Sequence, residues 1–515
     1  MGMGMTQALH RLVQRRADAL AAADSVERLS WHALHDRVAR IAGGLRQIGL
    51  QPGDRVAILS RNSVDFFAYV LGTWWAGGVI NPVNLRWTAG EMAYSLEDCQ
   101  TRILIVEDAF AQMIPDVLPE AAGLEHVFVI GAAPEGMREW RAFVAASEPV
   151  EDAMRGGDEL AAILYTGGTT GRPKGVMLSH GNLAGSMFGA LAGPNARTHD
   201  SYLHTAPMFH VGALSGVFIA LYSDATHYFL PAFDPVAVLE VIHREKVAEL
   251  FLVPTMLRML VDHPRFADYD IRSVLRIRYG ASPIDGGLMD RAIAAFPNAG
   301  FHQAYGMTEL SPIATVLGQE DHGPEGRASG RLRTAGRATA STEVRIVDSE
   351  DREVPFGSVG EVVVRGPGVM LGYWNMPEAT AEALRNGWMH TGDLGTMDKD
   401  GYVTVVDRLK DMIITGGENV YSAEVETALT THPDVAQAAV IAAPDEKWGE
   451  RVHAVVVARP GASPCADGLA AHCRQTLAGF KVPRSFDFVD ALPLSGAGKV
   501  LKNELRALQR ARIGD

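Results

Sequence analysis

One stretch of this chain concentrates residues suited to binding an anion. Residues 165–175, YTGGTTGRPKG, hold four glycines, three threonines and two cations. The stretch follows the apolar run 161–164, which predicts a strand, and we expect a helix after it. Glycine lacks a Cβ, so the backbone N–H groups of such a segment can converge on an anion. Phosphate is the natural candidate.

The stretch does not match the P-loop of ordinary nucleotide triphosphatases. That pattern ends in Gly-Lys followed by Ser or Thr, whose hydroxyl holds magnesium beside the phosphates. Here Lys174 follows Pro173 and precedes Gly175, so the NTPase interpretation fails. An isolated Gly/Thr stretch is as often a surface turn with a solvated lysine. Other motifs have to decide between the two roles.

Five further stretches follow along the chain: PMFHVG (207–212), QAYGMTE (303–309), WMHTGD (388–393), DRLKD with GGEN (407–419) and SGAGKVLKNELR (495–506). Together with 165–175 they resemble motifs of the adenylate-forming superfamily. That superfamily contains acyl-CoA synthetases, aryl-CoA ligases, peptide-synthetase adenylation domains and firefly-type luciferases. The resemblance covers nearly the whole chain. One departure is Gly167, where many members have serine; because the loop acts largely through backbone N–H groups, this loss need not disable it.

The resemblance implies a reaction in two halves. A carboxylate is a poor acyl donor, so the enzyme first joins it to AMP from ATP and expels pyrophosphate. The acyl-adenylate then reacts with the thiol of coenzyme A. Joining two anions requires preorganised positive charge at the α-phosphate. Lys499 resembles the family lysine that bridges carboxylate and α-phosphate, although outside its motif such a lysine is more often a solvated surface charge.

The same resemblance implies which residues hold ATP and Mg²⁺. Thr308 contacts the α-phosphate, and Glu309 is the magnesium-associated carboxylate, in keeping with the oxygen ligands that Mg²⁺ prefers. Tyr305 lies against adenine, where an aromatic face suits a flat base; its alternative role is core packing. Asp393 and Arg408 hold the ribose hydroxyls. The loop residues expected around the β and γ phosphates are Thr166, Gly168, Thr169, Thr170, Gly171 and Lys174, with Lys174 near the departing pyrophosphate.

The acyl pocket is expected at residues that are small or apolar and include no cation to read a second carboxylate: His210, Ala281, Ser282, Pro283, Ala304, Gly306 and Met307. In the family the histidine closes or gates the acyl site without acid–base chemistry, but His210 is also suited to core packing. In relatives specific for acetate a tryptophan stands at the position of Gly306. Glycine there predicts an open pocket, with backbone conformation at a strand end as its alternative role.

The second half-reaction is implied to need a rotation of the small domain. Lys410 occupies the hinge position, and the rotation removes Lys499 and brings the GGEN loop to a tunnel for pantetheine. Glycines would let that thin arm pass close to the backbone. The candidate CoA-binding residues are Gly416, Gly417, Trp448 and Lys481, with Arg484 beside them; a packed tryptophan and two solvated charges are an equally good account of the last three.

The elements expected to position these residues are those of an α/β protein. From residue 55 to about 310, short apolar strands alternate with helix-length segments, which predicts largely parallel sheets. We expect strands at 56–60, 103–106, 127–130, 161–166, 250–254 and 274–280, and an amphipathic helix over 7–23. Runs at 343–348, 361–366 and 402–406 are separated by turns and predict a small antiparallel or barrel subdomain.

The length of 515 residues implies more than one domain. We predict a large N-terminal domain, 1–409, made of two α/β subdomains plus a small β-rich subdomain, with the ATP and acyl sites. A mobile small α+β C-terminal domain, 410–515, follows and carries the hinge and the catalytic lysine.

Composition limits the classes of partner and compartment. The 47 Lys and Arg against 61 Asp and Glu leave a net charge of -14, which argues against a general nucleic-acid surface. No apolar run is long enough to cross a bilayer. Cys99, Cys465 and Cys473 lack metal-binding spacing, and their scarcity suits a reducing compartment. We expect a cytoplasmic protein; a homodimer is compatible with the sequence, which does not determine the oligomeric state.

The function predicted is that of an ATP-dependent, AMP-forming acid–CoA ligase for a medium- to long-chain or other hydrophobic carboxylic acid. The alternatives are an aryl-acid CoA ligase for benzoate- or cinnamate-like acids, a luciferase-like oxygenase, a stand-alone adenylating enzyme and a non-catalytic nucleotide-binding protein. Lys499, Glu309, Asp393 and Arg408 are all present, which argues against the last. No carrier-protein segment follows residue 515, which disfavours a peptide-synthetase module.

Overall fold

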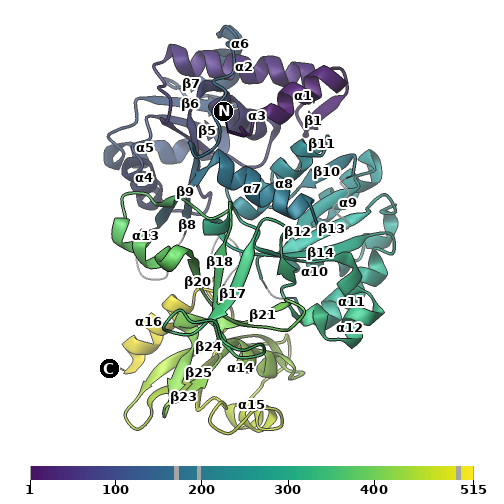
Figure 1. The fold of residues 1–515 in the computed structure, drawn as a ribbon, viewed down its shortest axis with the longest axis vertical. Coiled ribbons are helices and arrows are strands. Elements are labelled where there is room, and N and C mark those ends of the chain that lie inside the picture. The colour runs from purple at the N-terminus through teal and green to yellow at the C-terminus, as the bar shows by residue number, and fades with distance from the viewer. Residues whose placement is uncertain (1, 167–172, 194–198, 283, 495–499, 514–515) are drawn as a thin grey trace. The chain divides into compact units, whose positions relative to one another are not determined.

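The computed structural model describes residues 2–166, 173–193, 199–282, 284–494 and 500–513. These residues form two compact units: the first comprises the described parts of 2–344 together with 364–389, and the second comprises 345–363 and those of 390–513. Figure 1 shows the helices and strands in chain order. The α/β class is confirmed, whereas the domain boundary placed between residues 409 and 410 stays a prediction.

A nine-stranded sheet runs through one part of the first unit. Its order is β16 (Arg337–Ala338), β15 (Thr315–Leu317), β14 (Gly300–Tyr305), β13 (Arg276–Gly280), β12 (Glu249–Leu252), β10 (Ser201–His204), β11 (Thr226–Phe229), β1 (Leu20–Ala23) and β2 (Arg28–Ser30). The strands from β14 to β1 are parallel, and antiparallel strands extend both edges. Parallel strands bring their carboxyl ends to one edge, which is where open α/β sheets bind ligands.

An eight-stranded sheet forms the other part of the first unit. Its order is β19 (Gly372–Tyr373), β9 (Lys174–Ser179), β8 (Leu160–Thr166), β4 (Val79–Pro82), β3 (Arg55–Leu59), β5 (Ile103–Glu107), β6 (His126–Ile130) and β7 (Arg138–Glu139). The strands from β8 to β7 are parallel, while β9 is antiparallel to both β8 and β19.

A strand, β9, lies between the Gly-rich stretch and the helix expected after it. The stretch joins two antiparallel strands, with Thr166 opposite Lys174, because residues 174–179 continue the pairing with β8. The helix begins only at His180, where the Ser179 hydroxyl accepts a hydrogen bond from the backbone N–H of Asn182 at 3.0 Å. Such a cap satisfies a helix donor that has no partner within the helix.

The helices of the first unit are α1 (Gln7–Arg16), α2 (Trp31–Gln47), α3 (Val64–Ala76), α4 (Ala89–Asp98), α5 (Ile114–Val117), α6 (Trp140–Ala146), α7 (His180–Leu191), α8 (Val211–Tyr222), α9 (Pro235–Glu245), α10 (Pro254–Val261), α11 (Gly286–Ala295), α12 (Pro324–Ala328) and α13 (Pro377–Ala383). The helix predicted over 7–23 therefore ends at Arg16, because its last residues pair as β1 instead. Apart from Asp65 near the start of α3, helices α3 and α8 consist mostly of apolar and small residues, which explains their burial. Trp74 of α3 contacts Phe218 of α8, with 5.3 Å between ring centroids. None of the helices in the described part of the chain has the length and apolar character that a membrane crossing requires.

The second unit is built on two smaller sheets. One, most of whose residues belong to this unit, has the order β17 (Glu343–Val347), β18 (Gly360–Arg365), β20 (Met389–Met397) and β21 (Val403–Arg408). The other has the order β23 (Glu418–Val420), β22 (Ile413–Thr415), β25 (Gly449–Ala458) and β24 (Val435–Asp445), with β26 (Ser485–Phe488) paired to β25. Its helices are α14 (Ser422–Thr430), α15 (Ala466–Cys473) and α16 (Lys502–Ile513).

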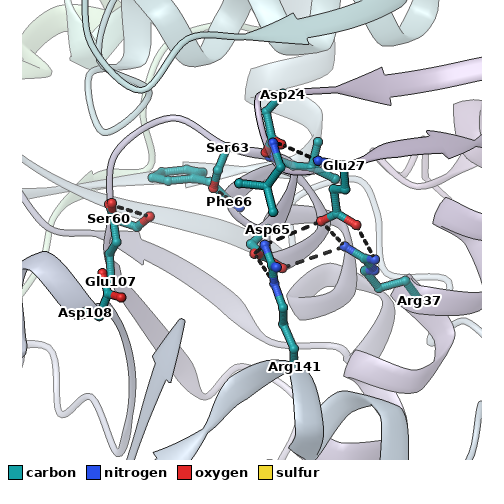
Figure 2. A network of polar contacts seen from close by, with 12 residues as sticks. Asp24, Glu27, Arg37, Ser60, Ser63, Asp65, Phe66, Glu107, Asp108 and Arg141 are labelled. Atoms are coloured by element: carbon teal, nitrogen blue, oxygen red, sulfur yellow. Dashed lines mark hydrogen bonds and ion pairs between the residues drawn. The ribbon is translucent and has the colours of Figure 1, made fainter. Parts of the chain in front are cut away.

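A buried ionic network holds the start of α3 (Figure 2). Asp65, 2% exposed, accepts hydrogen bonds from Arg141 Nε at 2.9 Å and Nη2 at 2.6 Å. Glu27 accepts two bonds of 2.6 Å from Arg37, whose Nη1 lies 3.7 Å from Asp65. Burial raises the pKa of Asp65, and the arginines oppose that rise. The network joins the turn after β1 to α2, α3 and α6 and leaves each buried charge with an opposite partner.

Five described histidines of the first unit are buried, and burial lowers the pKa of each below its usual value: His180, His204, His227, His302 and His322. Burial lowers the pKa of His180 to about 4, of His227 to about 3 and of His302 to about 2, and that of His204 well below its usual value. An unfolded histidine takes up its proton near pH 6.5. Below that pH the unfolded state therefore binds more protons than the folded state, so stability falls as the pH drops.

Replacing His180 with leucine tests this account. The ring packs on Trp74 with 5.6 Å between centroids, and neither ring nitrogen has a hydrogen-bond partner among the described residues. Between pH 7 and pH 5 the wild type should lose about 2 kcal/mol more free energy of unfolding than His180→Leu. Urea denaturation at the two pH values measures it. The exposed His32→Leu is the control and should follow the wild type; equal losses in all three proteins would contradict the account.

Candidate active site

The acyl-pocket candidates gather at the carboxyl edge of the nine-stranded sheet. Gly280 and Ala304 are register partners on β13 and β14, so Ala281 and Ser282 leave one strand beside the point where Tyr305 ends the next. His210, half-buried, is the last residue before α8 in the loop that follows β10. Strand topology thus places segments far apart in sequence at one edge. Pro283 lies outside the described residues.

The loop that carries His210 is held by Asn62. The Asn62 side-chain amide donates to the Ala206 carbonyl at 2.9 Å, and its oxygen accepts from the backbone N–H of Met208 at 2.8 Å. Asn62 is 3% exposed, so both bonds are protected from water. The two bonds from the Asn62 side chain hold the backbone of the loop just before His210, and so help to place His210 whichever role its ring has.

Gly306 has a steric reason to be glycine. A Cβ built on it would lie 1.8 Å from the Pro312 carbonyl oxygen, and backbone cannot move aside as a flexible side chain can. This supports the backbone role that the sequence left as an alternative. Lining of the acyl pocket by Gly306 stays a prediction, and a tryptophan here would displace the backbone as well as fill space.

The magnesium candidate Glu309 lies in the short 3₁₀ turn Thr308–Leu310 that follows β14. Its side chain is 6% exposed, and its Oε1 accepts a hydrogen bond of 2.9 Å from the Tyr373 hydroxyl. Its backbone carbonyl accepts from the N–H of Met370 at 2.9 Å. The half-buried Met307 and Thr308 come directly before it in the chain. A single buried carboxylate suits Mg²⁺, which usually takes one or two carboxylates together with phosphates and water.

Lys174 is the first residue of β9, opposite Thr166 at the end of β8. Its Nζ lies 4.7 Å from the ring centroid of Tyr373. Gly168, Thr169, Thr170 and Gly171 lie outside the described residues. Tyr373 was not among the predicted site residues, and its signal in the sequence is weak: it belongs to the stretch GYWN, 372–375, which has no helical or strand periodicity.

In the second unit the structure brings the two ribose candidates together. Asp393 of β20 and Arg408 of β21 are direct register partners, and Arg408 Nε lies 2.6 Å from Asp393 Oδ1. Asp393 is 4% exposed, and the partly exposed Arg408 balances its buried charge. The other carboxylate oxygen of such a pair can accept from a diol, as the predicted role requires.

The hinge candidate Lys410 lies in the 3₁₀ turn Leu409–Asp411, directly after β21. Arg506 of α16 donates to the Lys410 carbonyl at 3.4 Å and to the Asp411 carboxylate at 2.5 Å. Lys499 lies outside the described residues. Helix α16, which follows the tail motif, is thus bonded to the backbone of the predicted hinge.

Three of the CoA candidates meet in one place, together with Arg484. Gly416 and Gly417 have φ values of +62° and +84°, which favour glycine, and a Cβ on Gly416 would lie 2.6 Å from Trp448 Cε3. The Arg484 guanidinium lies 4.7 Å from the Trp448 ring centroid. Lys481, by contrast, forms an ion pair of 2.7 Å with Glu424, so its ammonium is already occupied in this conformation.

The comparisons with known proteins agree with these motifs. Residues 9–374 match the family model described as AMP-binding enzyme, and 424–499 match its C-terminal domain. A feruloyl-CoA synthase of an Amycolatopsis species is 41% identical over 93% of both chains, and the long-chain-fatty-acid–CoA ligase FadD13 of Mycobacterium tuberculosis is 34% identical over 97% of both. The crystal structure of ATP-bound MatB from Rhodopseudomonas palustris has 34% identity and a TM-score of 0.88, covering 98% of this chain and 99% of that one. The chain therefore belongs to the AMP-binding enzyme family, within the adenylate-forming superfamily of acyl-CoA synthetases.

Proposed function

We propose that this protein is an acid–CoA ligase that activates a hydrophobic monocarboxylic acid of medium to long chain length. AMP-forming CoA ligases of this family use ATP, Mg²⁺ and coenzyme A. The observation that carries the proposed substrate class is the edge of the nine-stranded sheet, where Ala281, Ser282, Ala304 and Met307 adjoin the turn of Glu309. None of these lining candidates is a cation that could pair with a second carboxylate.

In the adenylation step the substrate carboxylate attacks the α-phosphate of ATP, and pyrophosphate leaves. Lys499 bridges the two anions, and the Thr308 hydroxyl donates to an α-phosphate oxygen. Lys174 stabilises the charge that develops on the leaving pyrophosphate. Glu309 would hold Mg²⁺, which supplies positive charge to the phosphate oxygens when it is bound. Asp393, paired with Arg408, accepts hydrogen bonds from the ribose hydroxyls.

In the thioester step the CoA thiol attacks the acyl carbonyl, and AMP leaves. Rotation at Lys410 withdraws Lys499 and presents Gly416 and Gly417 to the pantetheine arm. The lack of a Cβ at these two positions allows close approach of that arm to the backbone. Trp448 and Arg484, stacked beside Gly416, form a surface that an adenine ring or a phosphate can contact.

An aryl acid is the second candidate substrate. It is favoured by the 41% identity with a feruloyl-CoA synthase, against 34% with the fatty-acid ligase. An aromatic acid with a propenoate chain has the same carboxylate and an apolar body, so the proposed catalytic residues act on it without change. The two candidates differ in the shape of the pocket beyond the carboxylate.

A matched panel of acids separates these candidates. CoA-dependent AMP release is measured with acetate, octanoate, dodecanoate, octanedioate, cinnamate and ferulate. We expect kcat/KM to rise several-fold per methylene up to the end of the pocket, because each buried CH₂ is worth about 0.8 kcal/mol. Octanedioate should be at least about tenfold worse than octanoate, because its second carboxylate would be buried without a partner. Preference for ferulate over both fatty acids would select the aryl candidate, and equal use of octanedioate would contradict the proposed pocket.

A further inference from the structure

We propose that Tyr373 is a positioning residue that sets the spacing between Glu309 and Lys174, holding the first with its hydroxyl and the second with its ring. The inference rests on the roles proposed above for Glu309 and Lys174. Both belong to the first unit, as Tyr373 does, and they come from different parts of the sequence. One side chain thus contacts the magnesium candidate and the lysine assigned to the leaving pyrophosphate.

The hydroxyl contact is buried and has a defined direction. Tyr373 is 8% exposed and Glu309 is 6% exposed, and the O–H donates to Oε1 at 2.9 Å. A phenol keeps its proton near neutral pH and a carboxylate can only accept, so Tyr373 is the donor of this bond. A hydrogen bond to a charged acceptor in a protected site is stronger than one between neutral groups. It restricts rotation of the carboxylate that would bind the metal.

The ring contact has a different chemistry. The Lys174 ammonium lies 4.7 Å from the ring centroid, within the range of a cation–π interaction. A ring face attracts the ammonium without accepting a conventional hydrogen bond from it, so its N–H groups can still turn to phosphate. Lys174 therefore lies beside Tyr373, which also holds the Glu309 carboxylate, and its ammonium can still donate hydrogen bonds.

The backbone around Tyr373 bonds to both sides of the site. Met370 N–H donates to the Glu309 carbonyl at 2.9 Å, and Trp374 N–H donates to the Gly175 carbonyl, next to Lys174, at 2.7 Å. Between them Tyr373 pairs with Val176 in β19 and β9. Residues 370–374 therefore connect the turn of Glu309 to the strand that begins at Lys174. The position of the phenol is determined by main-chain bonds at both ends of this short segment.

Two substitutions separate the hydroxyl from the ring. Nucleotide binding is measured by calorimetry with ATP and no acid, once in EDTA and once with saturating Mg²⁺; the ratio of the two affinities is the magnesium gain. Tyr373→Phe should lower the gain by about tenfold, the usual order for a hydrogen bond to a charged group, and leave the affinity in EDTA unchanged. Tyr373→Leu should also weaken binding in EDTA by about threefold, because Lys174 loses its aromatic contact.

The control variants distinguish a failure of the proposed role of Glu309 from a failure of the inference about Tyr373. Tyr69→Phe removes another buried hydroxyl, which donates to the Val56 carbonyl at 2.6 Å, and should leave the magnesium gain unchanged. Glu309→Gln is the benchmark and should lower the gain at least as far as Tyr373→Phe does. A normal gain in Glu309→Gln would overturn the proposed role of Glu309 and the inference with it. A reduced gain in Glu309→Gln with a normal gain in Tyr373→Phe would overturn the inference alone.

Discussion

Replacing Lys499 with alanine should slow acyl-adenylate formation by at least about 100-fold, the usual order for losing one preorganised donor at a developing charge. The reason is that carboxylate and α-phosphate are both anions, and little else in the tail motif can bridge them. Thioester formation from supplied acyl-adenylate should persist, because the rotation proposed above would withdraw this lysine from the site in the second half-reaction. Single-turnover assays of each half-reaction measure the two effects separately.

A second lysine of the same tail provides the contrast. Lys502 lies 2.7 Å from Glu426 and donates to the Ser422 hydroxyl at 2.6 Å, so its role is to hold α16 against α14. Lys502→Ala should affect both half-reactions to the same extent, through stability. If Lys499→Ala also lowered both equally, a separate conformation for each half-reaction would be the wrong hypothesis for this lysine.

Replacing Lys410 with proline should preserve adenylation and abolish most thioester formation. Proline fixes φ at its own position and restricts the residue before it, here Leu409, so the backbone rotation between the two conformations is hindered. The turn Leu409–Asp411 is three residues long and Lys410 is its central residue, so a restriction there affects the whole turn. The measurement is the rate of each half-reaction under single-turnover conditions.

Lys410→Ala is the matched control for the hinge. It removes the same side chain but leaves the backbone free, and the Lys410 carbonyl that accepts from Arg506 remains. Both half-reactions should therefore survive in the alanine variant. A proline variant with unimpaired thioester formation would show that the rotation takes place at another position.

The buried strands were well predicted because their signal is local. Runs such as 56–60, 103–106 and 127–130 are apolar and rich in β-branched residues, and β3, β5 and β6 begin and end within one residue of them. A strand covered on both faces needs a continuous apolar run, so composition alone identifies it. The helix predicted over 7–23 is present only as far as Arg16, because residues 20–23 pair with β11, which lies far along the sequence.

The polar contacts also divide into those between residues that the motifs had grouped and those that only the fold reveals. Asp393 and Arg408 were assigned together to the ribose hydroxyls, which stays a prediction, and the structure shows that they are cross-strand partners. The position of Tyr373 beside Glu309, 64 residues earlier in the chain, has no local pattern. No local pattern predicts that a side chain at Gly306 would collide with the Pro312 carbonyl either. Such contacts depend on how distant segments fold back on one another.

The sequence by itself determined the chemistry of this protein, because the residue types and order of the motifs around Lys174, Glu309, Asp393 and Lys499 are specific to acyl-adenylate formation. Only the tertiary structure decided which of the described side chains hold these groups in place. Tyr373 joins Glu309 to Lys174, and Arg506 joins α16 to the turn at Lys410. The physical reason is that a motif records which atoms a reaction needs, whereas hydrogen bonds and ring contacts between distant segments exist only after the strands that carry them have paired.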